Sequence, residues 1–200
     1  VVTDRAALIG AANTLTFMAN GQIQADNTDG LGFVSNIRQS LPGWTASAGP
    51  ALVLGSGGAA KAIVSALIAD GAPTVYVANR TRARADALRD QFGARVEPTD
   101  WTKISDLVAD SALVVNTTSL GMAGQPPLPI DLSRLDPPTV VTDIVYTPLE
   151  TDLLAQAAAR GCETVDGLGM LLHQAVPGFE RWFSYTPMVD DDLRAAVLGA

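Results

Sequence analysis

Short apolar runs alternate with helix-like segments through most of the chain beyond residue 50. The apolar runs at 51–54, 74–78, 112–115, 140–144 and 163–165 predict buried strands. Between them, residues 59–69, 82–92 and 151–160 have helical patterns, and Gly93 and Gly161 follow the last two. Buried strands that alternate with helices predict an α/β fold, a doubly wound parallel sheet of the Rossmann type.

The flanking segments have different patterns. Residues 13–17 and 22–25 predict two strands joined by a hairpin turn at 19–21, and the residues at the start of the chain also have a strand-like pattern. The polar cluster at 26–30 is able to cap a helix in which Leu31, Val34 and Ile37 share one face. Residues 41–50 predict a loop. A long helix over 168–183, in which Pro177 allows a break, precedes a short helix that starts near Asp190 and ends at Leu198.

Composition limits the possible function classes. The 200 residues are 48% hydrophobic and 17% charged, which supports a buried core and excludes intrinsic disorder. The net charge of −8 argues against nucleic acid as a partner, and no apolar run reaches the roughly 18 residues of a membrane span. A single cysteine, Cys162, and a single histidine, His173, leave little for disulfides or a metal site, and we expect structural roles for both. The expected location is cytoplasmic.

A glycine-rich turn follows the strand at 51–54. Gly55-Ser56-Gly57-Gly58-Ala59-Ala60 has the spacing of a dinucleotide-binding turn. In such a turn the first glycine permits the tight bend, the second lets the backbone approach a pyrophosphate, and the small third residue allows close packing of helix on sheet. The position between strand and helix favours this interpretation over a merely flexible turn.

The next strand ends in a cluster of arginines. Arg80, Arg82 and Arg84 lie within five residues of an otherwise acidic chain. A site that prefers NAD places a carboxylate here to bind the ribose 2′-hydroxyl, whereas guanidinium groups suit a 2′-phosphate. The cluster therefore predicts NADP as the cofactor. The alternative is an exposed basic turn.

Seven segments taken in order resemble the shikimate dehydrogenase family, and the resemblance runs from about Leu8 to Phe183. Each segment alone is weak evidence, but their shared order and spacing are specific. They are residues 9–15, 26–30, 55–60, 79–81, 116–118 with Gly121 and Met122, 143–146 with Pro148, and 166–174.

This resemblance implies an enzyme that reduces 3-dehydroshikimate to shikimate with NADPH, in aromatic amino acid biosynthesis. It implies that Asn13, Asp29, Tyr146 and Gln174 bind the substrate, and that Asp29 also belongs to the catalytic pair. For Asp29 the alternative is a helix N-cap. The resemblance further implies a set of cofactor-binding residues: Gly55, Ser56, Gly57, Gly58, Ala59, Asn79, Arg80, Thr81, Arg84, Thr118, Ile144, Gly167 and Met170.

The resemblance also implies the domain organisation. Residues 1–28 correspond to the remnant of a substrate-binding domain, 29–166 to the NADP-binding domain, and 167–200 to helices that pack back toward the substrate domain. Neither Lys61 nor Lys103 matches the catalytic lysine of the family, and the chain opens without methionine. We therefore expect a fragment that is inactive on its own, from a monomer or homodimer.

Two other functions stay open at this point. One is a non-catalytic module that binds NADP as a sensor. The other is a related dehydrogenase that acts on quinate or on an amino analogue of shikimate.

Overall fold

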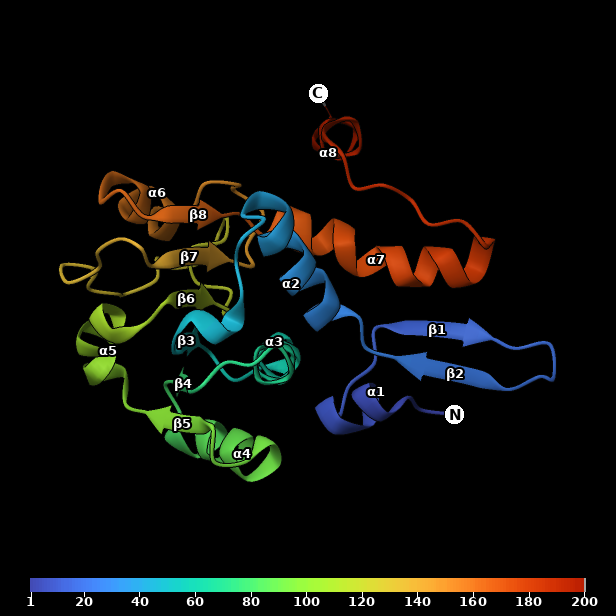
Figure 1. Ribbon diagram of the computed structural model, residues 1–200, viewed down its shortest axis with the longest axis horizontal. Helices are drawn as coiled ribbons and strands as arrows, with labels where there is room; N and C mark the ends of the chain where they lie inside the picture. The colour runs from blue at the N-terminus through green and yellow to red at the C-terminus, as the bar shows by residue number, and fades with distance from the viewer. Residues whose placement is uncertain (200) are drawn as a thin grey trace.

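A six-stranded parallel sheet forms the centre of the protein in the computed structural model, which describes residues 1–199 (Figure 1). Its strand order is β5-β4-β3-β6-β7-β8, and all five neighbouring pairs are parallel. The order reverses between β3 and β6, which is where doubly wound sheets bind ligands. The predicted fold class is confirmed. The strands are β3 (Ala51–Leu54), β4 (Val75–Ala78), β5 (Val96–Thr99), β6 (Leu113–Asn116), β7 (Val140–Asp143) and β8 (Glu163–Val165).

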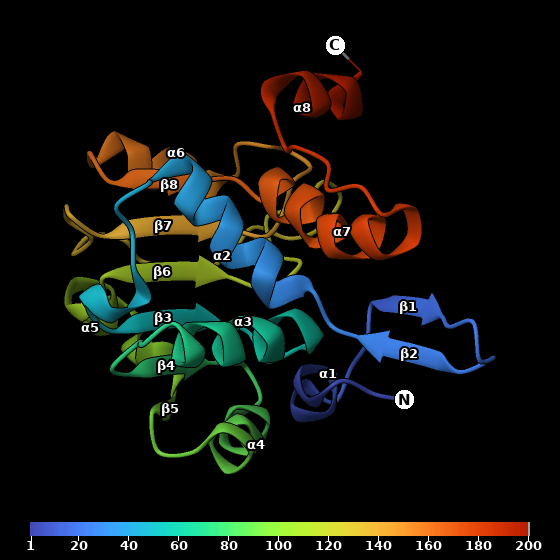
Figure 2. The same ribbon diagram turned by 45° about the vertical axis from the view of Figure 1, so that its right-hand side comes forward.

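Helices cover both faces of this sheet (Figure 2). In β3, Ala51 and Val53 pack into one apolar cluster, whereas Leu52 and Leu54 pack into the other. The first cluster joins α2 (Asp29–Ser40), α3 (Gly58–Ala69) and α4 (Arg82–Phe92) to the sheet, and the second joins α5 (Ile104–Asp110) and α6 (Asp152–Ala159). Short 3-10 helices, η1 (Ala46–Ala48) and η2 (Trp101–Lys103), lie in the connections.

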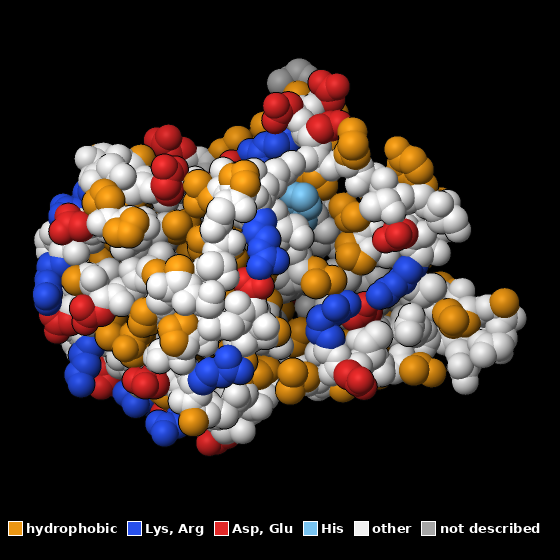
Figure 3. Space-filling view, viewed as in Figure 1, with side chains coloured by type: hydrophobic (Ala, Val, Ile, Leu, Met, Phe, Trp, Pro, Cys, Tyr) orange, Lys and Arg blue, Asp and Glu red, His pale blue; other side chains and the backbone are white. Residues whose placement is uncertain are grey.

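A hairpin projects from one end of the molecule (Figure 1). It consists of β1 (Thr14–Phe17) and β2 (Ile23–Asp26), which form a separate antiparallel sheet after α1 (Asp4–Ile9). The long helix α7 (Leu168–Phe183) packs against α2 and contacts β1, and α8 (Asp191–Leu198) ends the described chain. The hairpin carries exposed large apolar side chains, so part of its surface is hydrophobic (Figure 3): Leu15, Phe17, Met18 and Ile23.

Three elements differ from the sequence prediction. The strand-like pattern at the start is wrong beyond Val2, because Thr3 caps a helix there with its side chain. Strand β5 was missed because it contains Glu97 and Pro98, and a proline is tolerated there because β5 is an edge strand. Helix α7 continues through Pro177, since residues on both sides of the proline are buried against neighbouring elements.

Helices α2 and α7 lie in close contact. A β-carbon placed on Gly32 would lie 2.7 Å from both the backbone nitrogen and the Cβ of Gln174. Only glycine permits this distance between the two helix backbones. The first turn of α2 and the middle of α7 are therefore held against each other.

A buried carboxylate connects the hairpin to two helices. Asp26, at the end of β2, is fully buried, and it accepts hydrogen bonds from Thr3 Oγ1 (2.8 Å), Arg5 Nη2 (2.7 Å) and Arg181 Nη2 (2.6 Å). Arg5 Nε also donates to the carbonyl of Asn27 at 2.6 Å. Burial raises the pKa of Asp26, but the hydrogen bonds outweigh burial and hold the pKa below its ordinary value of 3.8. The carboxylate is therefore charged at neutral pH.

Asp26→Asn should lower the free energy of unfolding by about 2–4 kcal/mol at pH 7, because two arginines lose their anionic partner. A lowered pKa in the folded state adds stability above the unfolded pKa, and this stability is lost as the pH falls. The difference between parent and variant should therefore shrink as the pH falls below about 4, as measured by denaturant unfolding. Asp106→Asn is the matched control, because Asp106 pairs with Arg134 in solvent. Equal losses in the two variants would contradict this account of Asp26.

Candidate active site

The glycine-rich turn joins β3 to α3 and requires glycine at its first position. Gly55 has a φ of +108°, and a β-carbon there would lie 2.7 Å from Thr117 Oγ1. By contrast, a β-carbon on Gly57 or Gly58 would have no neighbouring atom within 4 Å. The backbone of the turn therefore faces open space at the positions where a phosphate group would approach.

Two further observations fit a pyrophosphate at this turn. Helix α3 begins after Gly57 without a side-chain cap, so its first-turn N–H groups keep their capacity to bind an anion. Ser56 Oγ is buried and has no hydrogen-bond partner among residues 1–199. A buried hydroxyl without a partner is uncommon, and a phosphate oxygen would satisfy it. The turn thus suits the phosphates of a dinucleotide.

Arginines line a cavity of about 640 Å³ beside this turn. Arg80 and Arg84 are exposed and line it, whereas Arg82 pairs with Asp86 (3.0 Å) and Asp100 (2.8 Å). These two acids raise the pKa of Arg82. The predicted cluster therefore divides into two arginines that line the cavity and one that forms ion pairs on the surface. The other lining residues are Asn79, Trp101, Thr118, Ser119, Leu120, Pro126, Pro127 and Pro129.

A second cavity, of about 180 Å³, brings together three of the predicted substrate ligands. Asp29 comes from the start of α2, Tyr146 follows β7, and Gln174 comes from α7. No lysine, arginine or histidine of the described chain lines this cavity. Its remaining lining residues are Leu171 and four of the predicted cofactor ligands, namely Ala59, Ile144, Gly167 and Met170.

Asn13 does not line this cavity, but it forms a hydrogen bond with Asp29, which does. Its Nδ2 donates to Asp29 Oδ1 at 2.6 Å, and its Oδ1 accepts from the backbone N–H and the hydroxyl of Thr28, each at 3.0 Å. Thr28 is the N-cap of α2, so the alternative role of Asp29 as N-cap is wrong. Instead, Asp29 is the first residue of the helix, and its side chain is held by Asn13.

The glycine turn lies next to residues of both cavities. Ala59, at the end of the turn, lines the cavity of Asp29, while Gly55 contacts Thr118, which lines the arginine cavity. Thr81 is not part of the arginine lining. It occupies the N-cap position of α4 without a side-chain hydrogen bond to the helix, and its carbonyl accepts a hydrogen bond from Asn79 Nδ2 at 2.9 Å.

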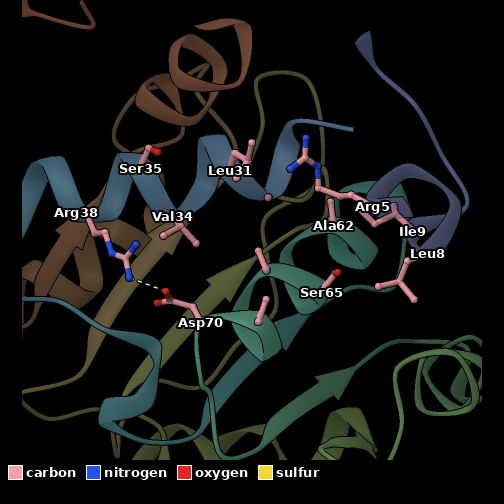
Figure 4. Close-up of a pocket in the computed structure, with 13 residues that line it drawn as sticks. Arg5, Leu8, Ile9, Leu31, Val34, Ser35, Arg38, Ala62, Ser65 and Asp70 are labelled. Atoms are coloured by element: carbon pink, nitrogen blue, oxygen red, sulfur yellow. Dashed lines mark hydrogen bonds and ion pairs between the residues drawn. The ribbon is translucent and has the colours of Figure 1, made fainter. Parts of the chain in front are cut away.

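A third cavity, of about 470 Å³, lies between α1, α2 and α3 (Figure 4). Leu31 and Val34 of α2 and the small side chains of α3 give it apolar walls. The charged groups at its two ends are already paired, Arg38 with Asp70 at 2.5 Å and Arg5 with Asp26. None of the predicted site residues lines this cavity, so the candidate site is formed by the other two.

Known proteins resemble the whole chain. A model of the family described as Shikimate / quinate 5-dehydrogenase matches residues 39–122. Shikimate dehydrogenase (NADP(+)) of Jannaschia sp. is 82% identical over 197 residues, which are 98% of this chain and 71% of that protein. The chain belongs to the shikimate dehydrogenase family. The resemblance carried by the seven sequence segments is thereby confirmed.

Solved structures of shikimate dehydrogenases and their relatives have the same fold. Quinate dehydrogenase from Corynebacterium glutamicum, in complex with NAD, has a TM-score of 0.91 and is 35% identical, over 100% of this chain and 71% of that chain. Shikimate 5-dehydrogenase from Thermus thermophilus, in complex with NADP(H) and shikimate, has a TM-score of 0.80 and is also 35% identical, over 94% and 67% of the two chains. Both nicotinamide cofactors thus occur among these structures.

One part of the site was not assigned from the family resemblance. Asp143, at the end of β7, is buried and accepts hydrogen bonds from Asn116 Nδ2 (3.0 Å), Val145 N (3.0 Å) and Thr151 Oγ1 (2.8 Å). Asn116 Oδ1 in turn accepts from the backbone and hydroxyl of Thr118. Burial raises the pKa of Asp143, although these hydrogen bonds oppose the rise. The sequence did contain a signal for this pair: Asn116 and Asp143 are polar residues at the carboxyl ends of two apolar strands, where sheets of this kind bind ligands.

The remaining singled-out side chains lie outside both cavities. His173 Nε2 lies 2.8 Å from Gln39 Oε1, and burial lowers the pKa of this histidine. Cys162 is buried in the second apolar cluster. Both positions fit the structural roles expected for them. Within residues 1–199, no helix has the length and apolar character needed to cross a membrane.

Asn13→Asp should make stability strongly dependent on pH, because it places a second carboxylate beside Asp29. Two adjacent carboxylates raise one of their pKa values in the folded state, so stability is retained below the unfolded pKa and lost as the pH rises. We expect thermal melts close to those of the parent at pH 4, and a loss of about 1.5–3 kcal/mol at pH 7.5. Asn20→Asp, at the exposed hairpin turn, is the control. A pH-independent loss in Asn13→Asp would contradict the contact with Asp29.

Proposed function

We propose that the protein to which this chain belongs is an NADP-dependent shikimate dehydrogenase that reduces 3-dehydroshikimate to shikimate. The observation that carries the proposal is the cavity that Asp29, Tyr146 and Gln174 line together with Ala59, at the end of the glycine-rich turn. The names of the curated relatives support it, since they are shikimate dehydrogenases that use NADP(+). We also propose a cytoplasmic enzyme that acts on a small molecule as a monomer or homodimer.

The site residues match the chemistry of a polyhydroxylated ring. A carboxylate, a phenol and an amide supply both hydrogen-bond donors and acceptors, and the methionine and isoleucine beside them exclude water. When NADPH is bound, it supplies the hydride that goes to the carbonyl carbon of the substrate. The protein must then orient the ring and deliver one proton to the carbonyl oxygen.

Asp29 is the group that we assign to proton handling. It is half-buried at the first turn of α2, and Asn13 Nδ2 holds one of its oxygens, which leaves the other available to a substrate hydroxyl. Asp29 therefore both orients the substrate and takes part in the proton transfer.

The lysine of the catalytic pair has no counterpart in this cavity. Because the described residues around Asp29 include no lysine, we propose that residues 1–200 alone bind the cofactor but turn over shikimate very slowly. The exposed apolar side chains of the hairpin support a further packed unit of the enzyme at this face, the substrate-binding domain to which residues 1–28 would belong. A non-catalytic NADP-binding module is the alternative, which the whole enzyme's turnover would exclude.

Quinate is a second candidate substrate. The specific observation in its favour is the similarity to quinate dehydrogenase from Corynebacterium glutamicum, at a TM-score of 0.91. Comparison of kcat/KM for shikimate and quinate in the whole protein decides between them, and we propose shikimate because the curated relatives bear that name.

Arg80→Ala should weaken NADPH binding by about 10- to 100-fold and leave NADH binding nearly unchanged. Arg80 lines the cavity unpaired by any acid within residues 1–199, and each charge-assisted hydrogen bond to a 2′-phosphate contributes about 1.5–3 kcal/mol. Calorimetric titration of both cofactors measures the effect. Arg89→Ala is the control, because Arg89 is an exposed arginine of the following helix α4 and does not line the cavity. Equal affinity of the parent for NADPH and NADH would refute the assignment of NADP.

Asp29→Asn in the whole enzyme should lower kcat about 10²- to 10⁴-fold, because a neutral amide cannot exchange the proton. The amide oxygen can still accept the hydrogen bond from Asn13, so the melting temperature should change little. The measurement is kcat with shikimate beside a thermal melt of the same variant. Activity within a few-fold of the parent would limit Asp29 to substrate binding.

A further inference from the structure

Trp101 lines the arginine cavity from the side of the sheet edge. It is the first residue of η2, directly after β5, and it lines the cavity together with Arg80 and Arg84. Its ring also packs against the second apolar cluster, so it is partly buried. A tryptophan with one side on the core and another on a cavity presents a rigid flat surface to whatever enters.

Two contacts fix the position of this indole. Trp101 Nε1 donates to the carbonyl oxygen of Pro129 at 3.1 Å, which ties the ring to the proline-rich segment on the cavity wall. The preceding residue, Asp100, pairs with Arg82 at 2.8 Å, which ties η2 to the start of α4. The indole nitrogen is thus tied to the proline segment, and the residue before Trp101 is tied to the helix whose first turn carries Arg84. Such a residue loses little conformational freedom when a ligand binds.

The lining of the cavity divides into a charged and an apolar part. Arg80 and Arg84 supply the charge, and Trp101 belongs to the apolar part. An adenosine 2′-phosphate has the same division, because its base is flat and weakly polar whereas its phosphate is anionic. The remaining apolar lining residues are Leu120, Pro126, Pro127 and Pro129.

We propose that Trp101 is a cofactor-binding residue whose indole packs against the adenine ring of NADP(H). This rests on the proposed function, in that it takes the arginine cavity as the adenosine subsite. Arg80 and Arg84 then bind the 2′-phosphate while Trp101 holds the base, and the fluorescence of Trp101 reports occupancy of this end of the site.

The test uses 2′,5′-ADP, which carries the adenosine and 2′-phosphate but no nicotinamide. In the whole protein, 2′,5′-ADP should quench tryptophan fluorescence, and Trp101→Phe should lose the quench while keeping most of the affinity measured by calorimetry. Trp101→Leu should weaken 2′,5′-ADP about tenfold or more, within the range for a base stacked on an aromatic ring. Nicotinamide mononucleotide should bind all three proteins equally. Trp44→Phe, remote from the cavity lining, is the control and should keep the quench.

Three outcomes would overturn the proposal. One is an unchanged quench in Trp101→Phe. Another is that Trp101→Leu binds 2′,5′-ADP within twofold of the parent while Arg80→Ala no longer binds it. The proposed function would then stand, but Trp101 would have no part in cofactor binding. The third is a parent protein that binds neither 2′,5′-ADP nor NADPH, which would overturn the proposed function as well. The fluorescence quench measured in Trp101→Phe tests the role of Trp101 even if the leucine variant does not fold.

Discussion

The buried carboxylate of Asp26 is the contact on which the geometry of the site depends. It receives hydrogen bonds from Arg5 of α1 and Arg181 of α7, so it joins three segments that lie far apart in the sequence. Asp29 follows three residues later, and Gln174 lies two helical turns before Arg181 on the same helix. A charge that is removed from water in this way is stable only with its partners in place. Asp26 and its two arginines therefore hold the hairpin to α1 and α7, close in the chain to Asp29 and Gln174.

The carboxyl ends of the parallel strands supply the rest of the binding geometry. Gly55 after β3, Asn79 after β4 and Thr118 after β6 all lie at this edge of the sheet. Asn116 and Asp143, at the ends of β6 and β7, are hydrogen-bonded to each other and hold Thr118 in place. In a parallel sheet the carboxyl ends of all strands lie at the same end of the sheet, so residues that are tens of positions apart in the sequence become neighbours there.

The features that were predictable from sequence depend on local patterns. The buried strands, the glycine turn and the helices that follow it each have a signature within about ten residues. Sequence reasoning failed where a distant partner decides the outcome. The arginine cluster alone did not separate Arg82 from Arg80 and Arg84, and only the family resemblance assigned the latter two to the cofactor. One partner of Arg82, Asp100, lies 18 residues away on the next strand–helix connection. The position of Trp101 on a cavity wall was equally hidden, since the strand before it contains Pro98 and has no apolar pattern.

The close contact at Gly32 has a consequence for the entropy of substrate binding. Because α2 and α7 approach so closely there, the backbones that carry Asp29 and Gln174 form one rigid unit before any ligand arrives. Groups that are already ordered lose little freedom on binding, so they contribute nearly their full interaction energy. Tyr146 differs, since it follows β7 in a loop and 46% of its surface is exposed. The entropic cost of assembling these three side chains around a substrate therefore falls mainly on the tyrosine.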